Sequence, residues 1–248
     1  MKNKAGVRGG RVSASEFPRL EQCPGSRNLI VKLGDNTIKE SEWSSSGDLV
    51  HKYLATRDTK LLEKMNDQQK DCSEKCIEQR GRIITQVFGS GEFESFVEER
   101  LWTPLKEHSR SFSGQADERF VSLDGKIGLV IDYKSLFGDV PAAPDNLQIG
   151  ALVVLAFFQK PTMEKCYGAI VQPPVSEHPV LVEYTPQMAG DMLEVLCGLI
   201  DAARDADAPL RTGDYCKWCP AILHCRAAKD IFGTVYKLAC ETQLDGLK

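Results

Sequence analysis

Two acidic residues and a lysine near the middle of the sequence form a combination that is typical of a metal-dependent hydrolytic site. Asp117 follows Gly114-Gln-Ala, and Asp132-Tyr133-Lys134 follows the apolar run Gly128-Leu-Val-Ile131. Side chains alternate along a strand, so Asp132 and Lys134 point to one face and Tyr133 to the other. Asp117 on a partner strand can then lie beside Asp132, and paired carboxylates suit Mg²⁺ or Mn²⁺. The alternative is a surface hairpin with one cross-strand Asp–Lys pair, and spacing alone does not separate the two.

The nine cysteines are a second group of residues that could do chemistry, because thiolates can bind metals. Cys216, Cys219 and Cys225 have C-x2-C-x5-C spacing, and a tetrahedral structural site needs a fourth ligand. Cys23 is the candidate, because His224 is adjacent to Cys225 and cannot easily point to the same metal. Zinc and a [4Fe–4S] cluster both accept four cysteines, and spacing does not choose between them. Other cysteines are expected to be free thiols, mostly in the core: Cys72 and Cys76 on one helical face, and Cys166, Cys197 and Cys240.

Apolar periodicity places these residues on a mixed α/β framework. The turn signal Asp124-Gly125 predicts a hairpin between the strands that carry Asp117 and Asp132. The middle of the chain reads helix, three strands, helix, strand. A first helix is expected from Ser13 to about Cys23, with Glu16 completing a capping box. Further helices are expected over 46–55, 60–88, 148–158 (with Asp145 near its N-cap) and 186–205. Strands are expected over 93–102, 113–123, 127–134, 167–172 and 180–184.

With these residues in place, the sequence resembles the RecB-like branch of the PD-(D/E)XK nuclease superfamily. Asp117 and Asp132-Tyr133-Lys134 match its acidic residue and D/E-x-K motif. Gly47-Asp-Leu-Val-His51 matches its G-x-x-x-H helix motif, and Gln148 matches the glutamine on the following helix. The pattern departs from the family at Leu152, where a tyrosine is usual. The resemblance implies a restriction-endonuclease-like αβββαβ core, and it is closest to phage-type and CRISPR-adaptation-type exonucleases.

The resemblance implies a Mg²⁺- or Mn²⁺-dependent deoxyribonuclease, an exonuclease that hydrolyses phosphodiester bonds in DNA recombination, repair or phage DNA processing. Asp117, Asp132 and His51 would bind the metal, together with the backbone carbonyl of Tyr133. Lys134 would position or polarise the attacking water, and Gln148 would orient Lys134 or the phosphate. Glu98 falls where many relatives have a strand glutamate, but a solvated charge at a strand edge is equally compatible, and Glu98 is left out of the predicted site.

One cysteine before the core and three after it resemble the iron–sulfur staple of AddB and of CRISPR-adaptation nucleases. The resemblance favours a [4Fe–4S] cluster held by Cys23, Cys216, Cys219 and Cys225, with zinc as the alternative. Helices added at both ends would be joined by this cluster.

Composition bounds the remaining possibilities. The chain has 248 residues and a net charge of −4, so any contact with DNA must come from a local basic patch. We expect one nuclease domain over 1–248, with its core at about 44–185 and the terminal segments forming the cluster region. No membrane span and no secretory signal are expected, which favours the cytoplasm of a bacterium or of a phage-infected host. Protein partners would belong to a recombination or replication complex. Two other functions remain open: a catalytically inactive nuclease-fold module for DNA binding or assembly, and a zinc-stapled RNA-binding protein.

Overall fold

A computed structural model describes residues 11–34, 42–104, 110–135, 140–231 and 233. The chain divides into two compact units. Unit 1 comprises Met1–Phe17 and Glu40–Cys197, and unit 2 comprises Pro18–Lys39 and Gly198–Lys248. Each unit is described by itself below.

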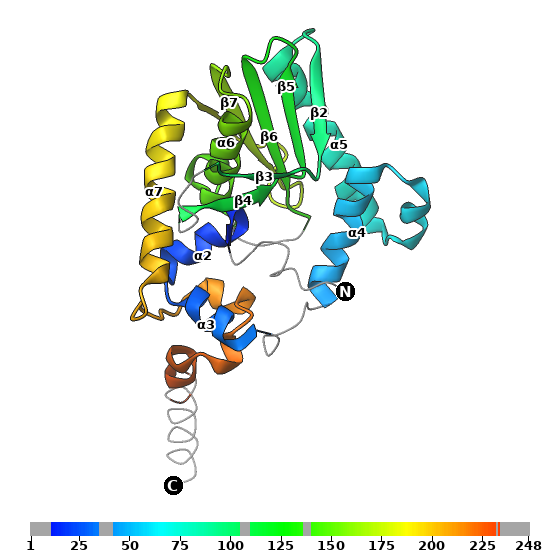
Figure 1. Ribbon diagram of the computed structural model, residues 1–248. Coiled ribbons are helices and arrows are strands. Elements are labelled where there is room, and N and C mark those ends of the chain that lie inside the picture. Colours follow the sequence, from blue (N-terminus) through cyan, green and yellow to red (C-terminus); the bar gives the residue numbers. More distant parts are fainter. Residues whose placement is uncertain (1–10, 35–41, 105–109, 136–139, 232, 234–248) are drawn as a thin grey trace. The chain divides into compact units, whose positions relative to one another are not determined.

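Unit 1 is built on a five-stranded sheet with the order β2-β5-β6-β7-β8 (Figure 1). Strands β6 and β7 are parallel, and the other neighbours are antiparallel. Helix α6 lies between β6 and β7 in the sequence, as a parallel pair requires. The predicted Asp124-Gly125 turn is confirmed: Gly125 has φ +74° and donates its N–H to the Ser122 carbonyl at 2.7 Å. The strands are β2 (Phe93–Val97), β5 (Glu118–Ser122), β6 (Ile127–Tyr133), β7 (Lys165–Val171) and β8 (Leu181–Tyr184).

A smaller sheet has the order β1-β4-β3, with β1 (Val12–Ser13), β4 (Phe112–Gln115) and β3 (Arg100–Trp102). It explains why two strand predictions were wrong. The expected strand 93–102 is two strands, because Glu98 adopts a left-handed backbone with φ +54° and the chain then enters the smaller sheet. The expected strand 113–123 is also divided, between β4 and β5. Both breaks bring acidic residues to the same end of the larger sheet.

The two faces of the larger sheet have different neighbours. Leu129, Ile131 and Tyr133 of β6 enter a hydrophobic core with helices α4 (Glu42–Thr56) and α5 (Asp67–Phe88). Positions of the opposite parity face α6 (Leu147–Gln159), whose residues 149–156 are all buried. A side chain at Gly168 of β7 would collide with Ile149 of α6, so the helix packs closely on the strand there.

The helices follow the predictions, with one region divided in two. The helical segment expected over 60–88 is a 3₁₀ turn, η3 (Thr59–Lys64), followed by α5, which begins after a capping box of Asn66 and Gln69. Helix α6 is capped by Asn146, directly after Asp145, and the Asn146 side chain accepts the N–H groups of Gln148 and Ile149. The Ser13 N–H donates to Glu16 at 2.7 Å, as expected of the capping box. The remaining elements are η1 (Ala14–Glu16), α2 (Phe17–Gln22), η5 (Ala143–Asp145) and α7 (Pro186–Arg204).

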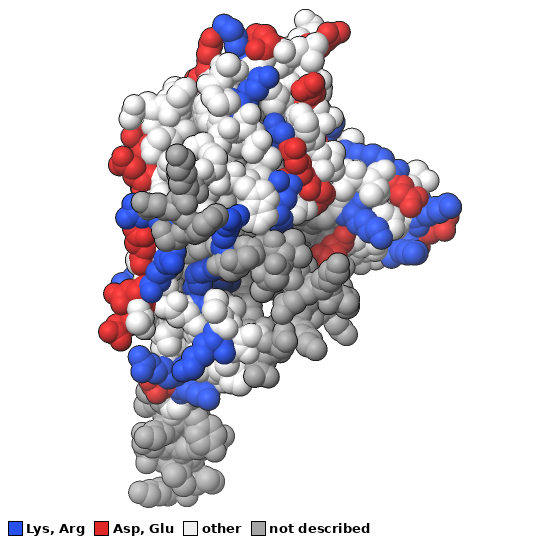
Figure 2. Space-filling model, in the orientation of Figure 1, with Lys and Arg blue, Asp and Glu red and all other residues white. Residues whose placement is uncertain are grey.

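Unit 2 joins two segments that are far apart in the sequence. It contains α3 (Ser26–Leu33) and two 3₁₀ turns, η6 (Asp214–Trp218) and η7 (Ile222–His224). The Gly25 N–H donates to the Pro209 carbonyl at 3.0 Å, and the Asn28 amide donates to the Asp205 carbonyl at 2.7 Å. Over unit 2, Figure 2 shows several basic side chains, with fewer acidic ones among them.

The predicted α/β class is confirmed by this arrangement. Among the described helices, none combines the length and the apolar character needed to cross a bilayer.

Candidate active site

Strand register places three carboxylates side by side at one end of the larger sheet. Glu118 of β5 is paired with Ile131 of β6 on one side and with Val97 of β2 on the other. One position further along, Asp117 therefore lies between Asp132 and Glu98. The Glu98 N–H donates to the Asp117 carbonyl at 3.1 Å, which continues the pairing beyond the end of β2.

Helix α4 adds an imidazole to this group. His51 Nδ1 lies 3.0 Å from Asp117 Oδ1, while the Tyr133 N–H donates to Asp117 Oδ2 at 2.6 Å. His51, Glu98 and Asp117 each offer one ligand atom, and the three atoms lie within 4.8 Å of one another. The structure thus brings together the predicted residues His51 and Asp117, and it adds Glu98, which the prediction left out.

A second set of polar contacts holds the other predicted residues. Lys134 Nζ forms an ion pair with Asp132 Oδ2 at 2.7 Å. The Gln148 amide bridges them, because its Nε2 donates to Asp132 Oδ1 at 2.6 Å and its Oε1 accepts from Lys134 Nζ at 3.3 Å. Asp132 is only 4% exposed, and burial of a carboxylate is costly unless it is paired in this way.

Glu98 is held by its own partners. The Gln115 side chain at the end of β4 donates Nε2 to the Glu98 carboxylate, and Arg100 of β3 donates to Gln115 Oε1 at 2.6 Å. These contacts come from the smaller sheet, so the break at Glu98 links both sheets to the site. The positive φ of Glu98 is the local feature that the sequence did not reveal.

Burial and neighbouring charges shift the pKa values of three site residues, Glu98, Asp132 and His51. Burial raises the pKa of Glu98, and the neighbouring Asp117 charge raises it further. Burial also raises the pKa of Asp132 despite the opposing charge of Lys134. Burial acts to lower the pKa of His51, but the hydrogen bond and charge of Asp117 outweigh it and the pKa is raised. A bound cation would reverse these effects on the carboxylates.

Two residues near the site, Tyr133 and Leu152, have buried side chains that pack against apolar neighbours. The Tyr133 side chain points away from Asp132, as strand alternation predicts, and is buried in the core. Leu152, which stands where the resemblance predicts a tyrosine, is 1% exposed in α6. A side chain at Gly114 of β4 would collide with Leu152. Position 152 is therefore part of the packing between α6 and the smaller sheet.

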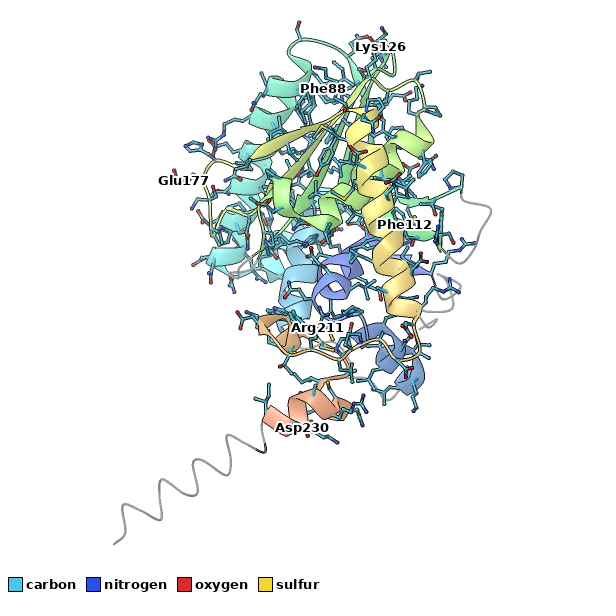
Figure 3. The ribbon with its side chains drawn as sticks, turned by 90° about the vertical axis from the view of Figure 1, so that its left-hand side faces the viewer. Phe88, Phe112, Lys126, Glu177, Arg211 and Asp230 are labelled. Carbon is cyan, nitrogen blue, oxygen red and sulfur yellow. The ribbon has the colours of Figure 1, made fainter. Side chains whose placement is uncertain are left out.

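The four predicted cluster cysteines line one cavity in unit 2. The Arg211 N–H donates to Cys23 Sγ at 3.3 Å, and the Cys216 thiol lies 4.0 Å from the Arg211 carbonyl. Figure 3 labels Arg211 and Asp230, which flank the segment that carries Cys216, Cys219 and Cys225. All four thiols are free, and burial raises the pKa of Cys219. The rest of the lining combines apolar and polar residues: Leu29, Leu210, Ile222 and Ala228 with Arg19, Ser26, Arg211 and Tyr215.

Of the other cysteines that the structure describes, none lines this cavity. Cys72 and Cys76 are buried in the core of unit 1, on one face of α5 as predicted, and Cys166 is buried in β7. Cys197 is half-buried. Cys240 lies outside the described residues.

Comparison with known proteins gives the class of fold. No family model and no curated protein matches the sequence. A solved structure of a candidate exonuclease from Eubacterium rectale is similar with a TM-score of 0.51 and 12% identity, over 87% of this chain and 89% of that one. An alkaline exonuclease from Laribacter hongkongensis has 9% identity over 79% of this chain and 91% of that one, with a TM-score of 0.34.

The likeness to the Eubacterium rectale protein, together with the sheet order, defines a restriction-endonuclease-like α/β fold. At this identity the similarity is one of fold, and the chemistry has to be argued from the residues of this chain.

Proposed function

We propose that this protein is a divalent-metal-dependent deoxyribonuclease of the RecB-like branch, acting as an exonuclease. One observation carries the proposal: His51, Glu98 and Asp117 converge within 4.8 Å, beside the bridged pair of Asp132 and Lys134. A structural ion pair needs only one carboxylate, and this arrangement has three at the end of one sheet.

The donor set fits Mg²⁺ or Mn²⁺. Carboxylate oxygens and one imidazole nitrogen are ligands of such cations, and burial together with the Asp117 charge raises the pKa of Glu98, an effect that a bound cation would oppose. His51, Glu98 and Asp117 would bind the metal, with Asp132 as a further ligand. The Tyr133 carbonyl would join them, because N–H and C=O of one strand residue point to the same edge and the Tyr133 N–H faces Asp117. When bound, the metal lowers the pKa of a water and stabilises charge on the phosphate.

The chain's own residues would then position the reacting groups. Lys134 is held by Asp132 and Gln148 with its ammonium beside the carboxylates. There it would orient the attacking water and offset negative charge that develops on the phosphate. Gln148 would keep Lys134 aimed at this point, because it bonds to both members of the pair. Gln115 would keep the Glu98 carboxylate turned toward Asp117.

DNA is the proposed substrate, and unit 2 offers side chains that suit it. Lys217, Arg226 and Lys229 of unit 2 are exposed. Trp218 is 59% exposed, with Lys217 Nζ 5.8 Å from its ring centroid. An exposed indole beside a cation can stack on a base while the cation meets the phosphates. Such an enzyme would work on DNA in the bacterial or phage-infected cytoplasm, with partners in recombination, repair or replication.

The cysteine cavity is proposed to hold a [4Fe–4S] cluster. Its fit to a soft, thiolate-bound group rests on four free cysteines that line the same cavity. Its ligands would be Cys23, Cys216, Cys219 and Cys225, and zinc is the alternative occupant. In either case the group would tie residues 18–34 to residues 205–230 and stabilise unit 2.

Digestion of end-labelled linear DNA, with circular DNA alongside, tests the function. We expect loss of end label with Mg²⁺ or Mn²⁺, none in EDTA, and no cleavage of the circle. DNA binding without cleavage under any divalent ion would favour an inactive DNA-binding or assembly module. Selective RNA binding, with one zinc per chain, would favour a zinc-stapled RNA-binding protein.

A further inference from the structure

Glu118, the residue after Asp117, is a buried carboxylate shared by two arginines. It is 3% exposed and lies on the core face of β5, away from the proposed metal site. Arg80 of α5 forms an ion pair with it through Nε, and Arg57 Nη2 lies 3.6 Å from its other oxygen. A carboxylate this deeply buried is costly unless both oxygens are compensated. The three residues therefore act as a unit.

Arg57 begins the loop after α4, the helix that carries His51. Its N–H donates to the Tyr53 carbonyl at 2.7 Å, and its φ is +56°. Among the residues that the structure describes, Arg57 and Glu98 are the two non-glycine residues with positive φ. A left-handed backbone at a residue with a long side chain persists only where the surroundings hold it. At Arg57, the surroundings include the contact of its guanidinium with Glu118.

We propose that Arg57, Glu118 and Arg80 form a clamp that sets the position of His51 against Asp117. Arg57 lies six residues after His51, about 9 Å along the helix axis. Glu118 is adjacent to Asp117, so the ion pair and the His51–Asp117 hydrogen bond join the same helix to the same strand at two points. The three are positioning residues, and their catalytic consequence rests on the proposed metal site.

The surroundings of the clamp make it sensitive to the loss of one member. Arg80 also lies over the Phe120 ring at 5.1 Å, within the core. The Tyr133 hydroxyl is buried with no hydrogen-bond partner in the described part of the chain. Tyr133 lies on the same face of the sheet as Glu118, two positions beyond its register partner Ile131, and burial and the Glu118 charge both raise the pKa of Tyr133. Neutralising Glu118 would leave two arginines facing this region without their carboxylate.

Four variants of the full chain separate positioning from general stability. Glu118→Gln keeps the shape but removes the charge. Arg57→Gly removes the guanidinium while relieving the positive φ, so it does not weaken the helix end by strain. Arg57→Lys keeps the charge. Val121→Ala is the matched control, because it opens a cavity on the same strand at a buried position outside the clamp.

Two readouts test the clamp. Amide hydrogen exchange of residues 48–56 reports whether α4 is held, and Mn²⁺ titration followed by electron paramagnetic resonance, without DNA, reports the metal site. For Glu118→Gln and Arg57→Gly we expect exchange in this segment at least 10-fold faster than wild type, and Mn²⁺ affinity about 10-fold weaker. Arg57→Lys should keep part of the wild-type protection from exchange and part of the wild-type Mn²⁺ affinity. Val121→Ala should lower the melting temperature without a selective change in this segment.

Unchanged exchange in both Glu118→Gln and Arg57→Gly would overturn the clamp, as would equal effects in Val121→Ala. If wild-type protein bound no Mn²⁺, the proposed metal site would fail, and the exchange data would still decide whether the clamp holds α4.

Discussion

The carboxylate site of unit 1 and the cysteine cavity of unit 2 are assembled in different ways. The carboxylates are neighbours through strand register, and each is fixed by a directional contact, such as the Tyr133 N–H on Asp117 or the Gln148 amide on Asp132. The cysteines come from short 3₁₀ turns and a helix connection, and their contacts are a long Arg211 N–H···Sγ bond and apolar packing. Sheet hydrogen bonds therefore give the first site its shape without a ligand, whereas the second has few polar contacts of its own.

This difference separates the expected effects of removing each proposed group. Removal of a divalent ion from the carboxylate site should abolish the proposed cleavage and leave the fold of unit 1 intact. Removal of a group held by the four cysteines should loosen unit 2 itself.

The largest effect is expected from Lys134→Ala and Asp132→Asn. Each should lower the single-turnover rate of DNA cleavage by about 10² to 10³, because a charge-stabilising or metal-binding group is lost. Gel-shift measurements should show that DNA binding survives, and circular dichroism should show an unchanged fold. Normal cleavage by Lys134→Ala would remove this lysine from the mechanism.

Cysteine substitutions should act on stability instead. Protein purified without oxygen should be brown, with about four irons and four sulfides per chain. Cys23→Ala and Cys216→Ala should remove the colour and lower the free energy of unfolding by about 2–5 kcal/mol, by analogy with a cross-link that closes a long loop.

Cys166→Ala is the control for this pair, since its thiol is buried in β7 outside the cavity. It should keep the iron and cost about 1 kcal/mol through a small cavity. If protein purified without oxygen contained about one zinc per chain and no iron, the four cysteines would bind zinc and not an iron–sulfur cluster. Iron retained in Cys23→Ala would contradict the four-cysteine ligand set.

Glu98→Gln tests whether the residue added by the structure belongs to the metal site. It preserves size and removes the charge, so Mn²⁺ affinity should fall at least about 10-fold in calorimetric titration. Glu99→Gln is the matched neighbour, because Glu99 instead pairs with Arg119. Its Mn²⁺ affinity should equal that of wild type. Equal losses in both variants would assign the effect to general surface charge.

Tyr133→Phe should have the smallest effect. The phenol faces the core and its hydroxyl has no hydrogen-bond partner among the described residues, so its removal leaves no partner unpaired. Thermal unfolding should show a stability change within about 1 kcal/mol, and the cleavage rate should stay within about 3-fold of wild type. A large loss of activity would mean that this side chain, rather than its backbone, serves the site.

Sequence patterns predicted the parts of the molecule that depend on local periodicity. Alternation along 127–134 separates Asp132 and Lys134 from Tyr133, and the Asp124-Gly125 signal fixes the hairpin that sets the register of Asp117. Cysteine spacing likewise pointed to the residues that line the unit 2 cavity. In each case the information lies within a few neighbouring residues or in a rare residue type.

The missed features depend on contacts that local patterns do not carry. A left-handed Glu98 ends β2 and turns its carboxylate to Asp117. The resemblance drew attention to this glutamate, but nothing in the run 93–102 marks its left-handed backbone. The shared ion pairs of Glu118 join residues 38 and more positions apart.

The discontinuous make-up of unit 2 has a consequence for how the protein folds during synthesis. The Arg211 N–H and Cys23 Sγ are 188 residues apart. At ribosomal speeds, residue 23 therefore emerges roughly 10 to 40 s before its partner. Unit 1 can form in that interval, since most of it lies between residues 40 and 197. Throughout this time the Cys23 thiol lacks its partner segment, so assembly of the proposed four-cysteine site must wait for residue 225 and can follow assembly of the five-stranded sheet.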